Sequence, residues 1–458
     1  MSEELEIVFE KMLAFFEERK FSALREVLSE MEPQDIANFM EENLDDKEQI
    51  VFFRILPKEL ASDVFVETES DTQESLIRAF TDKEIKAVIS DMFLDDAVDI
   101  IEEMPANVVK RILKNAAPED RKQINQLLSY PDDTAGSIMT PEFISLSKSA
   151  TVEQALDKIR IQGINKETIY TCYVTDTKKK LIGVVTAKDI LLADKHVTIE
   201  EIMETNVVSV ETLDPREDVA LTLSKYDYLA IPVVDKEGCV VGIVTVDDAV
   251  DVIQEEATED IHMMAGVLPT EKPYLKQSVW SIWKSRVPWL LLLMISATFT
   301  SMILSGFEEK LVLVANGVLY AFVPMLMGTS GNAGNQASAT VIRAIALDEV
   351  DFKDTLKVIG KELLASLLLA LTVGACCFGK LMLIDRLFNP NVTLTVAGIV
   401  SGVLFGSIII AKIIGAVLPL LAKKIKLDPA VMASPFITTI IDILSLVLYC
   451  VISIAILG

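Results

Sequence analysis

Residues 428–458 read DPAVMASPFITTIIDILSLVLYCVISIAILG. The part from residue 433 to 457 is apolar and long enough for a helix that crosses a bilayer, which needs about 20 residues. Asp442 is the only charged residue within that part. A charge at membrane depth is costly and by default marks an ion pathway or a polar partner. The end of the chain therefore predicts a membrane-spanning helix with a functional carboxylate.

Four further apolar stretches precede this one and predict a transmembrane domain over residues 284–458. The expected spans are residues 287–305, 311–342, 363–384, 394–422 and 433–457. Basic residues such as Arg286, Lys357 and Lys424 gather before the first span and in two of the loops. Because basic loops stay cytoplasmic, the N-terminal region is expected in the cytoplasm and the C-terminus outside. The predicted location is the cell inner (plasma) membrane, crossed several times.

Charge divides the chain into two regions. From Lys284 onward there are 13 Lys and Arg and 10 Asp and Glu, which leaves 29 and 58 before it and a net charge of −29 there. This acidity excludes nucleic acid as an expected partner, because phosphates are bound by Lys and Arg clusters. The five cysteines show no CxxC spacing and the N-terminus has no basic, apolar leader. No zinc site, disulfide framework or signal peptide is therefore expected.

Turn signals recur every 24 residues within residues 1–130. They fall at Pro33, Pro57, Thr81 and Pro105, and helical segments such as PQDIANFMEEN follow them. Pro and Thr are favoured where helices begin, and a fixed period is typical of stacked helical hairpins. This region is predicted to be a helical, solenoid-like domain.

Residues 138–255 contain an internal duplication. SIMTPEFISLSKSATVEQAL with GVVTAKDILL matches EIMETNVVSVETLDPREDVAL with GIVTVDDAVDV. The match aligns Thr186 with Thr245 and Asp189 with Asp248. Short apolar runs such as YTCYVT are typical of strands, and the segments between them of helices. The sequence therefore predicts two similar α/β halves.

The duplicated GxVTxxD signature resembles that of a tandem pair of CBS domains, here residues 131–200 and 201–255. In CBS domains that bind adenine nucleotides, the Thr and Asp of this signature face the ribose. The resemblance thus implies a candidate site for ATP or a related nucleotide at Lys188, Asp189, Tyr228 and Pro232. Dimerisation without a nucleotide is the alternative. A connecting helix is expected over residues 249–283.

The second span contains the polar stretch MGTSGNAGNQASAT, residues 327–340. Glycine and asparagine there are expected to interrupt the helix and expose carbonyl and amide oxygens, which Mg2+ and its bound waters prefer. Gly331, Asn332 and Asn335 are the candidate pore residues of this stretch. Small residues also permit close helix packing, which is the plain alternative.

Acidic residues at helical spacing are candidates for a divalent-cation sensor. Carboxylates that repel one another when empty, and are bridged when an ion binds, would make a conformation depend on that ion. An ordinary solvated surface is the alternative for each of them. The pairs are Asp95 and Asp99, Asp248 and Asp251, and Glu255 and Glu259.

Several motifs together resemble the MgtE family of magnesium transporters. They are GNAGNQ at residues 331–336, DPA at 428–430, Ser434-Pro435, and TTxxD ending at Asp442. The order of predicted domains also matches that family over essentially the whole chain. The expected fold is a multidomain membrane protein with an α-helical solenoid-like N-domain, an α/β tandem CBS pair, a connecting helix and a five-helix all-α transmembrane domain.

The resemblance implies a homodimeric Mg2+ channel in the lipid bilayer rather than an enzyme, with ATP as a candidate modulator. Asp442 would lie in the ion path with Thr438 beside it, while Ser434 and Pro435 would form the cytoplasmic mouth. The resemblance further implies that cytosolic Mg2+ closes the channel by binding to acidic and backbone groups. The implied positions are Asp95, Asp99, Gly136, Asp227, Asp248, Asp251, Glu255, Glu256, Glu259 and Asp428.

Two residues depart from the family pattern. Lys412 lies in the fourth span, where it would repel Mg2+ unless it snorkels to the cytoplasm or pairs with a carboxylate. Ser445 stands where a glycine is expected. A third feature, GACCFGK at residues 374–380, is an incomplete P-loop because Leu381 replaces the required Ser or Thr, so no ATPase is predicted.

Three alternatives to a Mg2+ channel stay open. The first is a transporter of another divalent cation, such as Co2+ or Mn2+. The second is a CBS-regulated anion channel, which would need Lys412 rather than Asp442 in the conduit. The third is a membrane sensor of Mg2+ or a nucleotide that transports nothing.

Overall fold

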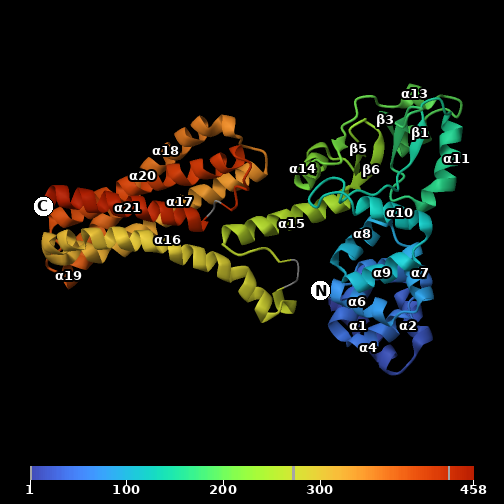
Figure 1. Cartoon of the computed structure of the whole chain (residues 1–458), viewed down its shortest axis with the longest axis horizontal. Helices are drawn as coiled ribbons and strands as arrows, with labels where there is room; N and C mark the ends of the chain where they lie inside the picture. The colour runs from blue at the N-terminus through green and yellow to red at the C-terminus, as the bar shows by residue number, and fades with distance from the viewer. Residues whose placement is uncertain (1–2, 271–273, 432–433, 458) are drawn as a thin grey trace. The chain divides into compact units, whose positions relative to one another are not determined.

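The chain folds into two compact units, Met1–Ile253 and Gln254–Gly458. The structure is a computed structural model that describes residues 3–270, 274–431 and 434–457. Figure 1 traces the chain through both units, from the N-terminal helices to the last helix.

Short helices form the N-terminal part of the first unit. They are α1 (Glu3–Glu17), α2 (Phe21–Leu28), α3 (Pro33–Asn43), α4 (Asp46–Phe53), α5 (Lys58–Val66), α6 (Ser70–Ala79), α7 (Asp82–Ser90), α8 (Leu94–Glu103), α9 (Ala106–Asn115) and α10 (Pro118–Leu127). Pro33 opens α3, and Pro57, Thr81 and Pro105 are the N-caps of α5, α7 and α9. These alternate helices stack, α3 on α5, α5 on α7 and α7 on α9. The 24-residue period therefore marks one stacked pair of helices.

Two three-stranded sheets of the same topology follow. β1 (Ser145–Ser147), β2 (Thr171–Thr175) and β3 (Leu181–Thr186) form one, and β4 (Val210–Glu211), β5 (Ala230–Val234) and β6 (Val240–Thr245) the other. In each sheet the first pair of strands is parallel and the second antiparallel. Their helices are α11 (Val152–Gln162), η1 (Gly163–Asn165), α12 (Ala187–Leu192), α13 (Ile199–Ile202) and α14 (Arg216–Tyr226). This repetition agrees with the predicted duplication.

The glycine of each repeated signature has a packing role. A Cβ at Gly183 would lie 2.7 Å from Met203 Sδ, and a Cβ at Gly242 would lie 2.7 Å from Met139 Sδ. Each methionine comes from the segment that leads into one half and packs on the last strand of the other half. The two halves are therefore interlocked through equivalent contacts.

Helix α15 (Val246–Met264) begins in the first unit and ends in the second. The predicted connecting helix over residues 249–283 is longer than the helix observed. α15 ends where Gly266 takes a positive φ of 68°, and Pro269 follows three residues after that glycine. A left-handed glycine after a helix terminates it by redirecting the chain.

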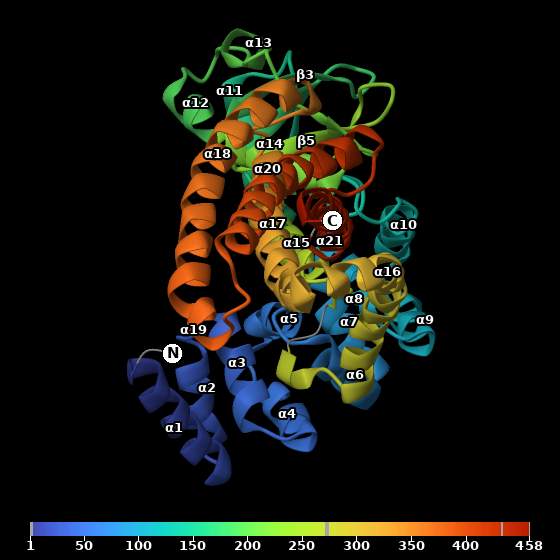
Figure 2. The ribbon, with the colours of Figure 1, turned by 90° about the vertical axis from the view of Figure 1, so that its left-hand side faces the viewer.

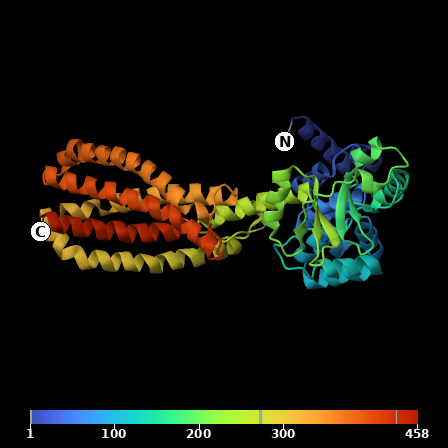
Figure 3. The same ribbon diagram turned by 90° about the horizontal axis from the view of Figure 1, so that it is seen from above.

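Long helices build the second unit, and Figure 3 shows α16 and α21 running side by side along it. The elements are η2 (Tyr274–Lys276), α16 (Val279–Leu313), η3 (Val314–Phe322), α17 (Val323–Ala346), η4 (Phe352–Asp354), α18 (Thr355–Lys380), the π-helix η5 (Leu381–Asp385), α19 (Arg386–Phe388), α20 (Leu394–Lys424) and α21 (Ser434–Leu457). α20 packs against α17, α18 and α21, and Figure 2 shows α18 at the edge of the bundle beside α20. α20 is thus the central helix of this unit.

Four helical stretches in the described residues are long and apolar enough to cross a bilayer. They are Val279–Glu309, Phe352–Phe388, Leu394–Lys424 and Pro435–Leu457, and they correspond to the first, third, fourth and fifth predicted spans. The predicted second span, residues 311–342, is divided among the end of α16, η3 and α17. The small and polar residues of α17 lower its hydropathy, so the count of five spans stays a prediction.

The expectation that residues 327–340 interrupt their helix was wrong. α17 runs unbroken from Val323 to Ala346. Gly331 and Gly334 lie against neighbouring helices instead, and close packing compensates for their low helix propensity. The alternative interpretation of this stretch, helix packing by small residues, is the one that the geometry supports.

Candidate functional site

α17, α20 and α21 meet at Gly334. A Cβ at Gly415 of α20 would overlap the Gly334 carbonyl oxygen, and a Cβ at Gly334 would overlap Ile441 Cδ1 of α21. The same Cβ would lie 3.2 Å from the carbonyl oxygen of Ala411. Only glycine lets helix backbones approach this closely. The crossing therefore sets which residues of α17 face α21.

Gly331 and Asn335 flank that crossing and face the polar residues of α21. A Cβ at Gly331 would lie 3.1 Å from Thr438 Cγ2 and 3.7 Å from Asp442 Oδ1. Asn335 Nδ2 donates to Thr438 Oγ1 at 3.1 Å, and Thr438 Oγ1 lies 3.3 Å from Asn335 Oδ1, to which it can donate. Asn332 is exposed on a neighbouring face of α17. The structure thus brings Gly331, Asn335, Thr438 and Asp442 together.

Asp442 lies in this group with an unsatisfied carboxylate oxygen. Oδ1 is buried and has no hydrogen-bond partner among the described residues. Burying such an oxygen costs free energy unless a donor or cation compensates. Asp442 could instead have a structural role, with its carboxylate hydrogen-bonded to a neighbouring helix. Oδ1 makes no such bond among the described residues. This oxygen is therefore a candidate partner for a cation.

The start of α21 lies beside the loop that follows α15. A Cβ at Gly266 would be 3.2 Å from Pro435 Cγ, and the rings of Trp289 and Phe436 make an edge contact with centroids 6.3 Å apart. Pro435 therefore lies where the connecting segment meets the predicted mouth. Ser434 opens α21, but its side chain lies outside the part that the structure describes.

Ser445 forms a buried hydrogen bond in place of the glycine contact expected from the family. Its Oγ donates to Ser330 Oγ at 2.9 Å, and Ser330 Oγ donates in turn to the Leu326 carbonyl at 2.7 Å. This chain of bonds links α17 to α21 three residues after Asp442. Hydrogen bonds between helices are an established means of holding membrane helices together.

A group of carboxylates, here termed the carboxylate cluster, lies in the first unit. It consists of Asp95, Asp96 and Asp99 of α8, Glu167, and Asp247 and Asp248 of α15. Burial, followed by repulsion from the neighbouring carboxylates, raises the pKa of Asp99 and Glu167 to about 8 and that of Asp96 to about 7. Burial likewise raises the pKa of Asp248 to about 7 and of Asp95 to about 6. The cluster is therefore strained when its members are ionised.

The sequence predicted Asp95, Asp99 and Asp248 but missed Asp96, Glu167 and Asp247. Asp96 and Asp247 are direct neighbours of predicted residues, whereas nothing in the local sequence marks Glu167. No three Asp, Glu, His or Cys side chains in the described residues converge as a ready-made metal cage. The cluster is a negative surface rather than a preformed coordination shell.

Asp251 lies at the margin of the carboxylate cluster, beside Glu67. The pKa of Glu67 is raised, first by burial of its side chain and then by repulsion from Asp251 and Asp63. The spacing of Asp248 and Asp251 on α15 suggested one shared site. After burial, Asp247 also raises the pKa of Asp251, so Asp251 adjoins the carboxylate cluster, and a site shared with Asp248 stays a prediction.

The second half of α15 carries another acidic group, and its central member was missed by the sequence analysis. Burial, then Asp428, Glu256 and Glu259, raise the pKa of Asp260 to about 6, while Arg343 lowers it. Asp260 lies four residues after Glu256, a helical spacing that would have indicated it. Glu255 is exposed on α15. Three of the predicted residues, Asp428, Glu256 and Glu259, thus lie around Asp260.

Gly136 and Asp227 have backbone roles in the structure. The Gly136 N–H donates to the Thr212 carbonyl at 2.9 Å, and a Cβ there would lie 2.5 Å from the Tyr130 ring. Asp227 is the C-cap of α14 with a left-handed φ of 54°. Their proposed part in ion binding rests on the family resemblance.

The nucleotide candidates are spread over two elements. Thr186 Oγ1 donates to Asp189 Oδ2 at 2.5 Å and caps α12, so the signature also has a structural use. Lys188 and Asp189 are exposed, whereas Pro232 is buried in β5. Tyr228 stacks on Tyr226 with ring centroids 5.5 Å apart.

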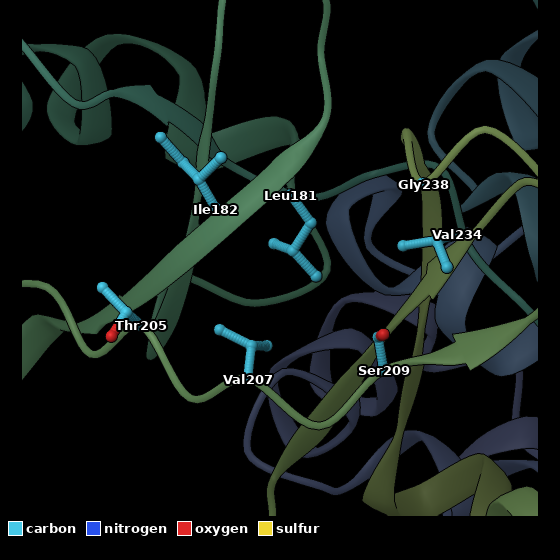
Figure 4. Close-up of a pocket in the computed structure, with 7 residues that line it drawn as sticks. All are labelled: Leu181, Ile182, Thr205, Val207, Ser209, Val234 and Gly238. Carbon is cyan, nitrogen blue, oxygen red and sulfur yellow. The ribbon is translucent and has the colours of Figure 1, made fainter.

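A shallow hollow lies elsewhere in the same pair of sheets. Figure 4 shows its lining side chains coming from β3, from the segment before β4 and from the β5–β6 hairpin. None of the four nucleotide candidates lines it. The lining residues are Leu181, Ile182, Thr205, Val207, Ser209, Val234 and Gly238.

Comparisons with known proteins cover nearly the whole chain. Residues 323–452 match a family model described as a divalent cation transporter, residues 31–133 the MgtE intracellular N domain, and residues 135–196 and 199–255 the CBS domain. The chain is 36% identical over 454 residues to a Thermus thermophilus protein named magnesium transporter MgtE, covering 98% of each chain. It is 30% identical to the Bacillus subtilis protein of the same name, covering 96% of this chain and 95% of that one. A crystal structure of the soluble part of a magnesium transporter matches 55% of this chain and 99% of its own, with 32% identity and a TM-score of 0.52.

We predict that Gly415→Ala destabilises the second unit, because its Cβ would overlap the Gly334 backbone. Overpacking of this kind typically costs about 1–3 kcal/mol. Thermal unfolding of the purified full chain in detergent measures the effect. Gly402→Ala on the same helix is the matched control, since a Cβ there meets nothing within 4 Å. Equal melting temperatures for the two variants would contradict the proposed crossing.

The raised pKa values of the carboxylate cluster predict a pH dependence of stability. These groups bind protons more tightly in the folded than in the unfolded state, so without metal the folded state is favoured at low pH. That stabilisation is lost as the pH rises from about 4 toward 8, as the cluster ionises. The melting temperature of the full chain in chelator should therefore fall from pH 6 to pH 8. Asp99→Asn should reduce that fall; an unchanged pH profile would contradict the raised pKa of Asp99.

Proposed function

The chain belongs to the MgtE family of magnesium transporters, and from that premise we propose that it is a Mg2+ channel with Asp442 in its conduit. The family is one of transporters with regulatory CBS domains, not of enzymes. Mg2+ enters down the membrane potential, and the channel closes when Mg2+ binds to the cytosolic domains. The N-terminal domains are cytosolic and the C-terminus lies outside.

The buried, unpartnered Oδ1 of Asp442 is the observation that carries this proposal. A carboxylate in an apolar helix bundle needs a positive partner, and a hydrated divalent cation supplies one. Mg2+ sheds its water reluctantly, so it interacts with such a group through bound water. Gly331, Asn335 and Thr438, which lie beside Asp442, offer small or polar surface to that water shell.

The driving force makes a gate necessary. Each charge gains about 2.3 kcal/mol on entering a cell at 100 mV, so Mg2+ gains about 4.6 kcal/mol. An ungated conduit would overfill the cell. Closure at high internal Mg2+ requires a closed state that binds more ions than the open state does.

The carboxylate cluster supports the proposed sensor. Its members lie close enough to raise one another's pKa values, so bringing them together without a cation is unfavourable. Mg2+ would neutralise them and stabilise the arrangement seen here. α15 carries Asp248 near its start and Asp260 near its end, so one helix contains carboxylates of both acidic groups.

A homodimer is part of the proposal. Ile161, Ile164, Leu191 and Leu192 are largely exposed on the first CBS domain, and exposed apolar residues of this density favour a protein partner. A second copy would place two Asp442 carboxylates at one conduit. ATP remains a proposed modulator at Lys188 and Asp189, whose exposed side chains suit an anionic ligand and a ribose.

The anion-channel alternative loses its main support. It required Lys412 to line the conduit, but Lys412 pairs with Glu362. The choice between Mg2+ and another divalent cation, such as Co2+ or Mn2+, is one of selectivity and is measured by competition in the flux experiment below.

We expect Asp442→Asn to lower Mg2+ entry by about tenfold or more, because the substitution removes the charge that offsets the cost of bringing a cation into the bilayer. Entry is measured in proteoliposomes with a negative internal potential and a Mg2+-free cytosolic side. Asp385→Asn, which alters a carboxylate that pairs with Lys380, is the matched control and should pass Mg2+ at nearly the native rate. If a correctly folded Asp442→Asn variant passed Mg2+ at the native rate, Asp442 would not be the conduit residue.

Mg2+ should also raise the melting temperature of the full chain at pH 8, and more than Na+ of equal ionic strength. Asp99→Asn and Asp248→Asn should shift half-saturation to several-fold higher Mg2+, since each removes one charge from the carboxylate cluster. Asp157→Asn, at an exposed residue paired with Arg160 on α11, should leave it unchanged. If all three variants showed the same half-saturating Mg2+ concentration, the carboxylate cluster would not be part of the sensor.

A further inference from the structure

All three tryptophans of the chain lie within ten residues in the first part of α16, at Trp280, Trp283 and Trp289. The rings of Trp280 and Trp283 are stacked, with centroids 4.7 Å apart, and the two residues are 67% and 49% exposed. An indole ring carries a large apolar area, which is favourable to remove from water. The pair therefore presents an apolar surface that the described chain leaves largely uncovered.

The face of α16 that carries this pair also carries two exposed basic residues, Lys284 and Arg286. They lie about 100° and 60° from Trp283 around the helix axis. The opposite face points inward, because Ser285 is buried and its carbonyl accepts a hydrogen bond from the Leu268 N–H at 2.9 Å. The outward residues are here termed the aromatic–basic face. They are Trp280, Trp283, Lys284 and Arg286.

The aromatic–basic face comes directly before the apolar part of the same helix. Residues 287–307 contain no charged side chain, and about 20 such residues cross the bilayer core. The stretch Val279–Glu309 has 31 residues and is about 46 Å long, which exceeds the core thickness of roughly 30 Å. Most of the excess is at the start of the helix. The aromatic–basic face therefore lies at the level of the headgroups, where tryptophan is enriched.

The charge of this segment indicates which lipids it fits. Residues 274–307 contain three basic residues and no acidic one. Anionic lipids give the cytosolic surface of a membrane a negative potential that attracts basic residues next to a span. We propose that the aromatic–basic face binds the headgroups of anionic phospholipids in the cytosolic leaflet. The tryptophans insert between lipids, and Lys284 and Arg286 contact the phosphates.

The third tryptophan joins this surface to the start of α21. A Cβ at Gly266 would lie 3.8 Å from Trp289 Cβ, and the rings of Trp289 and Phe436 make an edge contact. Lipids bound at the start of α16 thus anchor a helix that packs on the turn after α15 and on the first residues of α21. The inference concerns lipid recognition and does not depend on whether the chain conducts Mg2+.

The clustered tryptophans make intrinsic fluorescence a local reporter for the test. The full chain is placed in phosphatidylcholine vesicles in which the same fraction of lipid is replaced by brominated phosphatidylcholine or by brominated phosphatidylglycerol. Bromine quenches the indoles that it contacts. Quenching should show a preference for the anionic lipid of about fivefold or more, the factor expected of one basic residue at an anionic surface.

Two pairs of substitutions locate the preference. Lys284→Gln combined with Arg286→Gln should lower it to less than about twofold, while both lipids still quench because the tryptophans remain. Lys353→Gln combined with Lys361→Gln is the matched control. It removes the same charge from exposed residues of η4 and α18, and it should leave the lipid preference unchanged.

The proposal is overturned if the native chain shows no preference, if Lys284→Gln with Arg286→Gln keeps it, or if the control pair loses it equally. Quenching by neither brominated lipid would also overturn it, and would show that a protein surface such as a second copy covers this face. A salt series on the native chain needs no substitution, so it does not depend on the folding of a variant. The preference should fall with ionic strength, and a constant preference would contradict the role of the two basic residues.

Discussion

The backbone contact between Gly334 and Gly415 is the constraint on which the second unit depends. It lets α17 lie directly against α20, and Ile441 of α21 packs on the same point. In a bilayer the apolar faces of helices gain little from leaving lipid, so close packing and interhelical hydrogen bonds hold the bundle together. The bonds Asn335–Thr438 and Ser330–Ser445 lie on either side of Asp442 and join the same two helices. The polar residues of α17 therefore support the helix that carries the carboxylate.

Buried charge is used in two opposite ways in this protein. Lys412 and Glu362 offset each other, and their pair is compatible with an apolar surrounding. Asp442 has no such partner for its buried oxygen, and the carboxylate cluster gathers like charges at raised pKa values. A paired charge is structural, whereas an unpaired one creates a demand for a cation. The two unbalanced groups are the ones to which a role in ion transport or sensing is assigned.

α15 gives these groups a physical connection. Its 19 residues begin at the carboxylate cluster and end beside Asp260. A helix of this length spans about 28 Å. The turn after it, at Gly266, contacts Trp289 and Pro435 at the start of α21. Within the second unit, the turn after α15 thus adjoins the start of the helix that carries Asp442.

Local features of the fold were predictable from the sequence. Capping residues predict where helices begin, at Pro33, Pro57, Thr81 and Pro105. Alternation predicts the duplicated strands, and hydropathy predicts the apolar stretches. All three signals depend on residues that are close together in the chain. The carboxylate at Asp442 was predictable for the same reason, since a lone charge in an apolar run stands out locally. The resemblance to the family motifs is what identified Thr438 and the GNAGNQ stretch as candidate pore residues.

The partners of these residues were decided by tertiary structure. Glu167 joins Asp95, and Asp260 joins Asp428, across stretches that carry no shared local signal. Glu362 and Lys412 lie 50 residues apart, and Gly334 of α17 packs against α20 rather than breaking its helix. Sequence by itself determined which residues are costly to bury. Only the packing of helices decided which of them are compensated, because burial and pairing depend on distances in space that the spacing along the chain does not contain.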